Sequence, residues 1–177
     1  MSEIAPGGPH FRKATPEGDN RERDVCDRCG FIDYRNPKIV VGSVLSFERK
    51  ILLCRRAIDP CRGYWTLPAG YLETGETVED GARREAFEEA RVEAELGQVL
   101  GVYSVPRISQ VQIIFRGTLR APDFAPGPES LDVQLFEWAE IPWPDIAFPT
   151  VGWALRHWKE CEGLSAFPPY GNPVEGL

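Results

Sequence analysis

The sequence predicts one mixed α and β domain that follows a short segment of different composition. Two apolar runs of strand type lie next to each other at Lys38–Phe47 and Lys50–Arg56. One helical pattern extends from Thr77 to about Ala90, and further strand patterns follow it. A chain of 177 residues with 42% hydrophobic and 27% charged residues is globular and long enough to bury a core.

The two apolar runs are predicted to be strands joined by a turn near Glu48 and Arg49. A third extended stretch is expected at Gly63–Glu73, where Pro68 and Gly70 bend the chain. Before Lys38 the sequence is rich in Gly, Pro and charge and has little periodic pattern.

The predicted helix has both a start signal and an apolar face. Thr77 can cap it, with Asp80 at the third helical position as an aspartate version of the capping box. Small side chains every four residues allow the helix to lie close to a sheet. This stripe consists of Val78, Ala82, Ala86 and Ala90.

The second half of the chain predicts more strands and a closing helix. Strands are expected at about 92–105, 111–119 and 131–138, and a helix at Thr150–Glu160. The expected organisation is an N-terminal segment at 1–37, the main domain at 38–162 and an irregular tail at 163–177.

Charge and composition exclude several classes of function. A net charge of −7 argues against sequence-independent binding of nucleic acid, which requires a basic surface. No apolar run approaches the roughly 18 residues of a membrane span, and the N-terminus lacks the apolar centre of a signal peptide. The five scattered cysteines do not form a disulfide framework, so we expect a reducing cytoplasm.

Three glutamates, Glu85, Glu88 and Glu89, are separated by three and four residues on the predicted helix. Side chains at these spacings have Cβ atoms about 5–6 Å apart, and like charges there destabilise a helix. A solvated acidic face is the simplest interpretation. The small-residue stripe nearby and the preceding glycine-containing loop favour another: clustered carboxylates with a backbone carbonyl suit Mg²⁺ or Mn²⁺.

The stretch Gly70–Val92 resembles the Nudix box, written as Gly, five residues, Glu, seven residues and Arg-Glu-apolar-any-Glu-Glu-any-Gly-apolar. The positions that match are Gly70, Glu76, Arg84, Glu85, Ala86, Glu88, Glu89 and Val92. Arg91 stands where the family has Gly, and a residue other than Gly in a left-handed conformation costs about 1–2 kcal/mol. We therefore expect a strained or slightly longer helix end.

The resemblance implies an α/β/α sandwich around a mixed sheet, with the box as a loop–helix–loop. It implies that Glu85, Glu88 and Glu89 bind one or more divalent ions with the Gly70 carbonyl. It also implies that Glu76 and Arg84 pair with each other and hold the loop against the helix.

The activity that the resemblance implies is hydrolysis of a nucleoside diphosphate linked to another group. Bound cations offset the charge of the pyrophosphate and lower the pKa of a coordinated water. One of the clustered glutamates, or Glu129 from a later loop, would accept the proton of that water. Asp132 is a weaker substitute, and an ordinary exposed carboxylate is the alternative for Glu129.

Segments between about Arg23 and Trp158 resemble one Nudix subgroup, led by a zinc-ribbon-like segment and acting on ADP-ribose, FAD and related dinucleotides. The residue array typical of NADH pyrophosphatases is absent after the box, so an ADP-ribose or FAD type of substrate is favoured over NADH. Arginines that could contact phosphate and aromatics that could stack on adenine are candidates, with surface and core roles as alternatives. These candidates are Arg55, Arg56, Arg107, Tyr64 and Trp65.

A single CxxC motif, Cys26 and Cys29, lies before the main domain. A structural zinc ion usually takes four ligands, commonly from two Cys pairs. Relatives in the subgroup carry a first Cys pair that this chain lacks, and His10 is the one nearby substitute. A knuckle without metal and a metal shared between two chains are therefore both open.

Two other functions compete with hydrolysis. One is a catalytically silent Nudix module that senses an ADP-ribose-like ligand, and the other is a zinc-ribbon protein that binds nucleic acid. The intact glutamates oppose the first, and the missing Cys pair and net acidity oppose the second. The expected partner is a small-molecule nucleotide, with no nucleic acid and no membrane, and relatives imply a homodimer.

Overall fold

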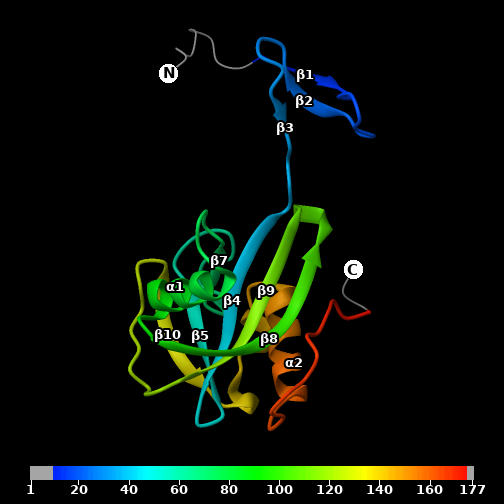
Figure 1. Cartoon of the computed structure of the whole chain (residues 1–177). Helices are drawn as coiled ribbons and strands as arrows, with labels where there is room; N and C mark the ends of the chain where they lie inside the picture. Colours follow the sequence, from blue (N-terminus) through cyan, green and yellow to red (C-terminus); the bar gives the residue numbers. More distant parts are fainter. Residues whose placement is uncertain (1–9, 175–177) are drawn as a thin grey trace. The chain divides into compact units, whose positions relative to one another are not determined.

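The computed structural model describes residues 10–174, and the chain divides into two compact units, residues 1–36 and residues 37–177. The first unit holds a three-stranded antiparallel sheet in the order β1-β2-β3 (Figure 1). Its strands are β1 (Phe11–Ala14), β2 (Arg23–Cys26) and β3 (Ile32–Asp33). The sequence does not predict these strands, because the sheet buries almost no apolar face and so leaves no periodic pattern.

The second unit contains a seven-stranded mixed sheet in the order β10-β5-β4-β9-β8, with β6 paired to β5 and β7 paired to β4. β4 and β9 run parallel, and the other pairs are antiparallel, as a mixed sheet requires. The strands are β4 (Lys38–Phe47), β5 (Lys50–Arg56), β6 (Trp65–Thr66), β7 (Ala69–Tyr71), β8 (Ala94–Val105), β9 (Gln110–Leu119) and β10 (Ser130–Phe136).

The two shortest strands lie between β4 and β5. Those long strands pair only beside their turn, at Ser46–Ile51 and Phe47–Lys50, and then separate. Beyond that point β6 pairs with β5, and β7 pairs with β4. The predicted third stretch is therefore two strands, because Pro68 has no N–H for a ladder and its carbonyl accepts instead from Ser43 N at 3.2 Å. Gly70 of β7 lies opposite Val41.

Helix α1 (Val78–Ala90) begins and ends close to the predicted residues. Thr77 caps it, since its Oγ1 accepts from Asp80 N at 3.1 Å. The Asp80 carboxylate accepts from the Thr77 hydroxyl at 2.7 Å. The second hydrogen bond of the capping box is thus donated by the Thr77 side chain and not by its backbone N–H. Arg91 ends the helix at φ 58° and ψ 30°, and its N–H donates to the Phe87 carbonyl at 2.9 Å. The helix end is thus in the left-handed conformation, and the helix is not longer than predicted.

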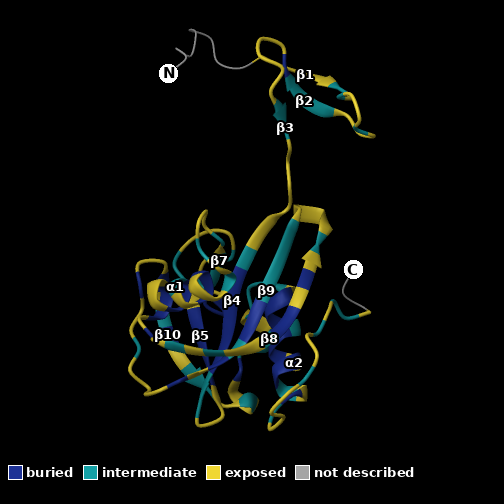
Figure 2. Cartoon of the chain, in the orientation of Figure 1, coloured by how far each residue is buried: buried dark blue, intermediate teal, exposed yellow. Residues whose placement is uncertain are grey.

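Helices α1 and α2 (Pro149–Glu160) cover opposite faces of the sheet (Figure 1). Successive strand residues alternate between the two cores: Val44 packs in a cluster with α2, and Leu45 packs in a cluster with α1. The stripe predicted on α1 is buried, with Ala82 and Ala86 fully covered. The unit is therefore the predicted α/β/α sandwich, and burial is concentrated in its central strands and helices (Figure 2).

The tail after α2 is irregular except at one point. Tyr170 forms a bridge with Gly101 of β8, and its ring stacks on His157 with the ring centroids 4.3 Å apart. Three short 3₁₀ turns complete the described chain, at Pro106–Ile108, Trp138–Glu140 and Trp143–Asp145. Within residues 10–174, no helix combines the length and the apolar character needed to cross a membrane.

Candidate active site

The three glutamates of α1 have different surroundings. Glu85 and Glu89 are 8% and 6% exposed, whereas the side chain of Glu88 is 54% exposed. Because Glu85 and Glu89 are separated by one turn of the helix, they share the edge of the small-residue stripe that packs against the sheet. A purely solvated acidic face is therefore wrong for two of the three side chains.

Gly70 provides the space for the Glu85 carboxylate. A Cβ atom on Gly70 would overlap both carboxylate oxygens of Glu85. β7 holds this glycine beside α1, since Gly70 pairs with Val41 in the next strand. The Glu85 carboxylate thus lies against the backbone of Gly70.

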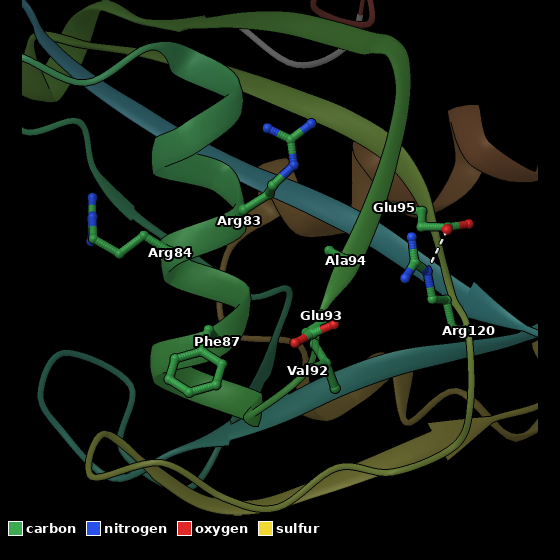
Figure 3. A pocket seen from close by; sticks show the side chains of 8 residues that line it. All are labelled: Arg83, Arg84, Phe87, Val92, Glu93, Ala94, Glu95 and Arg120. Atoms are coloured by element: carbon green, nitrogen blue, oxygen red, sulfur yellow. Dashed lines mark hydrogen bonds and ion pairs between the residues drawn. The ribbon is translucent and has the colours of Figure 1, made fainter.

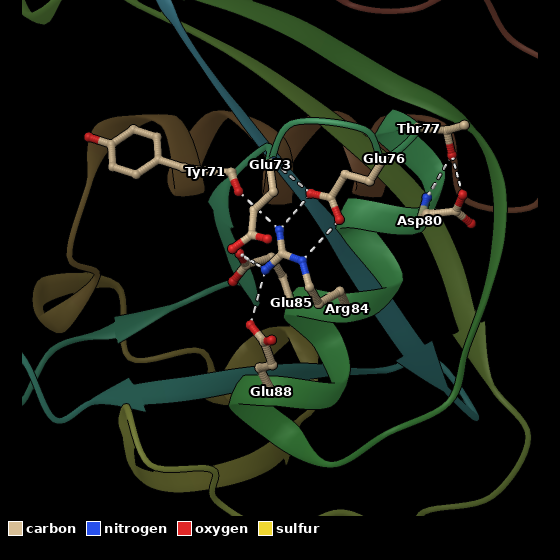
Figure 4. Close-up of polar contacts among 8 residues, drawn as sticks. All are labelled: Tyr71, Glu73, Glu76, Thr77, Asp80, Arg84, Glu85 and Glu88. Carbon is tan, nitrogen blue, oxygen red and sulfur yellow. Dashed lines mark hydrogen bonds and ion pairs between the residues drawn. The ribbon is translucent and has the colours of Figure 1, made fainter. Parts of the chain in front are cut away.

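Arg84 connects the loop before α1 to the helix (Figure 4). Its guanidinium donates to both oxygens of Glu76, at 2.7 and 3.0 Å, and to the Tyr71 carbonyl at 3.0 Å. The same group donates to Glu85 at 2.6 Å and to Glu88 at 3.0 Å. The expected pairing of Glu76 with Arg84 is present, and the bridge from Arg84 to two of the clustered glutamates was not predicted.

These contacts perturb the charges of the motif. The hydrogen bonds from Arg84, followed by that from Glu73 N at 2.7 Å, lower the pKa of Glu76 to about 2. Burial raises the pKa of Glu85 above its ordinary value, and the hydrogen bond from Arg84 opposes this increase. Glu76 therefore stays ionised as a structural anchor, while the Glu85 carboxyl lies in a partly desolvated place.

Glu89 is the most perturbed carboxylate of the cluster. Burial raises its pKa to about 8, even though Ala69 N donates to its Oε2 at 3.2 Å and the positive charge of Arg56 opposes the increase. The negative charges of Glu85 and Glu129 raise it further. A carboxylate of this kind favours either a proton or a cation near neutral pH.

The loop before β10 brings Glu129 to the cluster. Ala125 N and Gly127 N each donate at 3.0 Å to carbonyls at the end of α1, those of Ala90 and Glu89. A Cβ on Gly127 would overlap the backbone of Glu88, so only glycine allows this approach. The Glu129 carboxylate is then near enough to raise the pKa of both Glu85 and Glu89.

The donor set suits a hard divalent cation, with carboxylates around a glycine cradle. The expected convergence of the three glutamates is nevertheless incomplete. In the part of the chain that the structure describes, no three His, Cys, Asp or Glu side chains converge as metal ligands. The reason is local. The Arg84 guanidinium lies between Glu85 and Glu88 and forms ion pairs with both, while the Glu89 carboxylate accepts a hydrogen bond from Ala69 N. Binding of a cation would require the first two carboxylates to turn away from Arg84.

The other predicted site residues fall into two groups. Arg56 lies near Glu89, and its guanidinium donates to the Pro60 carbonyl at 2.9 Å and stacks over the Phe148 ring. The neighbouring Arg55 donates to the Gly63 carbonyl at 2.8 Å. Tyr64 beside them is 45% exposed and free to stack on a ligand.

Trp65 and Arg107 are placed differently. Trp65 is 9% exposed and meets the Phe136 ring edge-on at 4.9 Å, so its stacking role is wrong and its core alternative holds. Arg107 is exposed in the 3₁₀ turn between β8 and β9. Among residues 10–174, no ion pair or hydrogen bond links Arg107 to the glutamates.

A hollow of about 390 Å³ lies beside α1, where the chain leaves the helix and enters β8 (Figure 3). Charged side chains line much of it, and Arg120 pairs with Glu95 across it. It shares Arg84 and Val92 with the motif but includes none of the clustered glutamates and not Glu129. We therefore place the candidate site at the glutamates and not in this hollow.

Two contributors were missed in the sequence. Gly127 holds the loop of Glu129 on the end of α1, and Arg84 bridges Glu85 and Glu88. The i,i+4 spacing of Arg84 and Glu88 was a usable signal for the second. No local pattern signals the first, because the contact joins segments far apart in the sequence.

The Cys26–Cys29 pair lies at the end of β2 in the first unit. All five cysteines are free thiols, and Cys26 is buried while Cys29 is exposed. His10 does not complete a ligand set with them in the described chain, so the pair holds half of the ligands of a zinc site.

Comparisons with known proteins agree with this geometry. A family model described as NUDIX domain matches residues 36–154, and a zinc-ribbon model described as Nudix N-terminal matches residues 7–35. An ADP-ribose pyrophosphatase from Methanocaldococcus jannaschii is 31% identical over 113 residues, which are 62% of this chain and 67% of that protein.

Solved structures show the same fold. A crystal structure of a NUDIX hydrolase from Nitrosomonas europaea is 44% identical, with a TM-score of 0.87 and 97% of each chain covered. The NUDIX domain of NrtR from Shewanella oneidensis, complexed with ADP ribose, is 21% identical, with a TM-score of 0.60, and the match covers 72% of this chain and 89% of that one. At that identity the second likeness concerns the fold alone.

Proposed function

This chain belongs to the Nudix family, and on that premise we propose that it is a Mg²⁺-dependent hydrolase of a nucleoside diphosphate linked to another group, of ADP-ribose or FAD type, with AMP as a product. Mn²⁺ is the alternative ion. The family match and the likeness to a solved NUDIX hydrolase support the fold, the family and the hydrolase class, whereas the metal and the substrate are proposed.

The observation that carries the proposal is the buried pair Glu85 and Glu89 beside the backbone of Gly70. Burying two carboxylates on neighbouring turns costs free energy unless a positive partner compensates them. Arg84 compensates Glu85, whereas Glu89 has a single backbone donor and a pKa near 8. Glu85, Glu88, Glu89 and the Gly70 carbonyl are the groups that would hold the ion.

The bound ion would offset phosphate charge and acidify a water molecule. The residues of the chain supply the rest. Arg84 fixes the loop and the helix relative to each other through Glu76 and the Tyr71 carbonyl, so the helix that carries the clustered glutamates keeps its place during turnover. Glu89 or Glu129 would accept the proton of the attacking water, and the raised pKa of Glu89 suits a base that works near neutral pH.

Support for the substrate class is more indirect. The archaeal relative is named as an ADP-ribose pyrophosphatase. In this chain, Arg56 lies near Glu89, and Arg55 and the exposed ring of Tyr64 are neighbours of Arg56, so the three offer contacts for phosphate and for a flat base. Arg107 has no such neighbours and stays a sequence prediction only.

A panel of substrates tests the proposal. Purified protein with Mg²⁺ is incubated with ADP-ribose, FAD, NADH, diadenosine polyphosphates and nucleoside triphosphates, and release of AMP is measured by chromatography. Release from ADP-ribose or FAD supports the proposal, and preference for NADH would assign a different dinucleotide. Tight binding without turnover of any compound would favour a sensor and contradict hydrolysis. A cytoplasmic location and a homodimer stay predictions from the sequence.

The Glu89→Gln variant tests the site itself. The substitution keeps the size of the side chain and removes its charge, so we expect turnover to fall by roughly two to four orders of magnitude with the fold intact. Glu95→Gln is the matched control, because Glu95 is an exposed glutamate of β8 paired only with Arg120. Near-normal rates in Glu89→Gln would show that the site is misplaced.

A further inference from the structure

The described residues of the first unit, 10–36, form almost no core of their own. Among residues 10–36, Cys26 is the single buried hydrophobic residue, while Phe11, Phe31 and Tyr34 are 42%, 59% and 57% exposed. Figure 2 shows its strands mostly intermediate or exposed. Units of fewer than about 40 residues usually depend on a disulfide, a metal or oligomerisation, because the area they bury is too small.

Ion pairs do not replace this core. In four of the five pairs of the described part of the unit the basic side chain is exposed, and such pairs contribute little because water and salt screen them. They are Arg12–Asp27, Lys13–Asp24, Arg23–Asp19, Arg35–Asp24 and Arg35–Asp33. Stabilisation of the unit therefore has to come from a partner outside it.

The Cys26–Cys29 turn is already shaped to bind a metal ion. Gly30 N donates to the Cys26 carbonyl at 2.9 Å, and Cys26 N donates to the Phe31 carbonyl at 2.8 Å. Gly30 has φ +71°, which a glycine adopts without strain. The backbone N–H groups of Cys29 and Arg28 face the Cys26 thiol, so the turn wraps around its sulfur atom.

The ligand set within one chain stops at two thiols. The sequence contains no cysteine before Cys26 and none between Cys29 and Cys54. His10 is close along the sheet, since its carbonyl accepts from Asp27 N at 2.9 Å, yet no third ligand joins the pair among residues 10–174. Cys29 is exposed, so one side of the pair is open to another molecule.

We infer that two copies of this chain bind one zinc ion between them, with Cys26 and Cys29 of each copy as its four ligands. Four Zn–S bonds form as four thiols release their protons to solvent and the ion loses its water ligands. The partner copy would also cover Phe31, which follows Cys29 by two residues and is the most exposed aromatic side chain of the unit. The site is incomplete without the second copy.

The test measures metal content and mass together on the full chain. Reduced protein is supplied with zinc and analysed by native mass spectrometry and elemental analysis. We expect one zinc ion per two chains, found only in the dimeric species. Replacement by cobalt(II) should give the absorption spectrum of a tetrahedral four-thiolate site.

Two variants make the test specific. Cys29→Ser should lose both the zinc and the cobalt spectrum, whereas Cys61→Ser should keep both, because Cys61 is a partly exposed thiol of the second unit. If Cys29→Ser unfolds the first unit, the metal ratio and spectrum of the unmodified chain still decide. Substrate turnover with Mg²⁺ serves as an independent readout of the second unit.

Three results would overturn the inference. One is a ratio of one zinc ion per chain in the monomeric species, which would mean a site completed within one copy. Another is the absence of zinc from the reduced protein. The third is a dimer that dissociates with a reductant and not with a chelator, which would indicate a disulfide between copies instead of a metal.

Discussion

Helix α1 and the sheet of the first unit both carry dense charge, and they use it differently. Asp24 in β2 pairs with the exposed side chains of Lys13 at 2.9 Å and Arg35 at 3.1 Å, and the hydrogen bond from Lys13 lowers its pKa. Glu89 in α1 is buried, and its pKa rises to about 8. The same chemical group is thus stabilised as an anion in one unit and destabilised as an anion in the other.

The difference comes from the core beneath each element. α1 lies on strands whose side chains are fully covered, so its inner carboxylates lose water. β1–β3 have no such layer, and the Asp24 carboxylate keeps its charge through ion pairs with exposed basic side chains. Clustered acidic residues therefore acquire raised pKa values only where a packed layer excludes water from them. In the first unit, the reactive groups are the two thiols of Cys26 and Cys29 instead.

The largest expected effect is a pH dependence of stability due to Glu89. Its pKa is about 8 in the folded protein, against an ordinary value of 4.5. Below about pH 4.5 the Glu89 carboxyl is protonated in both the folded and the unfolded state, so it does not lower the free energy of unfolding. Between about 4.5 and 8 only the unfolded state ionises, so the free energy of unfolding should fall as pH rises, by an amount on the order of a few kcal/mol.

Urea denaturation of metal-free protein across this pH range measures the effect. Glu89→Gln should remove most of the slope, and Asp24→Asn should leave it in place, because the pKa of Asp24 is lowered from its ordinary value of 3.8 and so lies below this pH range. Mg²⁺ should raise the melting temperature more at about pH 8 than at about pH 5, since the ion binds the ionised carboxylates. A flat profile in the unmodified protein would show that Glu89 is hydrated in solution.

A second prediction concerns the cradle of Glu85. Gly70→Ala places a Cβ atom where the Glu85 carboxylate lies, although the backbone of Gly70 is one that alanine can adopt. The carboxylate must move, and we expect kcat/KM to fall by about a hundredfold. Gly171→Ala is the matched control, because a Cβ at Gly171 meets nothing within 4 Å. Normal turnover in Gly70→Ala would show that the position of the Glu85 carboxylate does not matter for the reaction.

The sequence predicted what depends on local periodicity. The apolar runs of β4 and β5, the cap at Thr77 and the small-residue stripe of α1 are all present. The stripe also indicated which edge of the glutamate cluster faces the sheet, and Glu85 and Glu89 are indeed buried. These features follow from residues within a few positions of one another, so a single sequence contains them.

Features that depend on distant segments were not predicted. The contact between Gly127 and the end of α1 is made by backbone atoms of a loop and a helix, so no side-chain pattern in the sequence predicts it. The separation of β6 from β7 depends on how β4 and β5 diverge. The incomplete convergence of the glutamates follows from Arg84, whose reach toward Glu85 depends on how the loop before α1 folds back.

The smallest expected effect is at the end of α1, where the box departs from its usual glycine. Arg91 has φ 58°, a conformation that costs a residue other than glycine about 1–2 kcal/mol. Arg91→Gly removes that cost, loses an exposed contact of the guanidinium with the Phe87 ring at 5.3 Å, and adds freedom to the unfolded chain. The net expectation is a gain of about 0.5 kcal/mol in the free energy of unfolding, with turnover unchanged.

Arg83→Gly is the matched control for this substitution. Arg83 is an exposed arginine of the same helix, but it lies inside the helix, where glycine costs roughly 0.5–1 kcal/mol relative to alanine. The two variants should therefore shift the urea midpoint in opposite directions although each exchanges Arg for Gly. A loss of stability in both would mean that the Arg91 side chain contributes more than its backbone costs, and the departure from the Nudix box would then be a stabilising one.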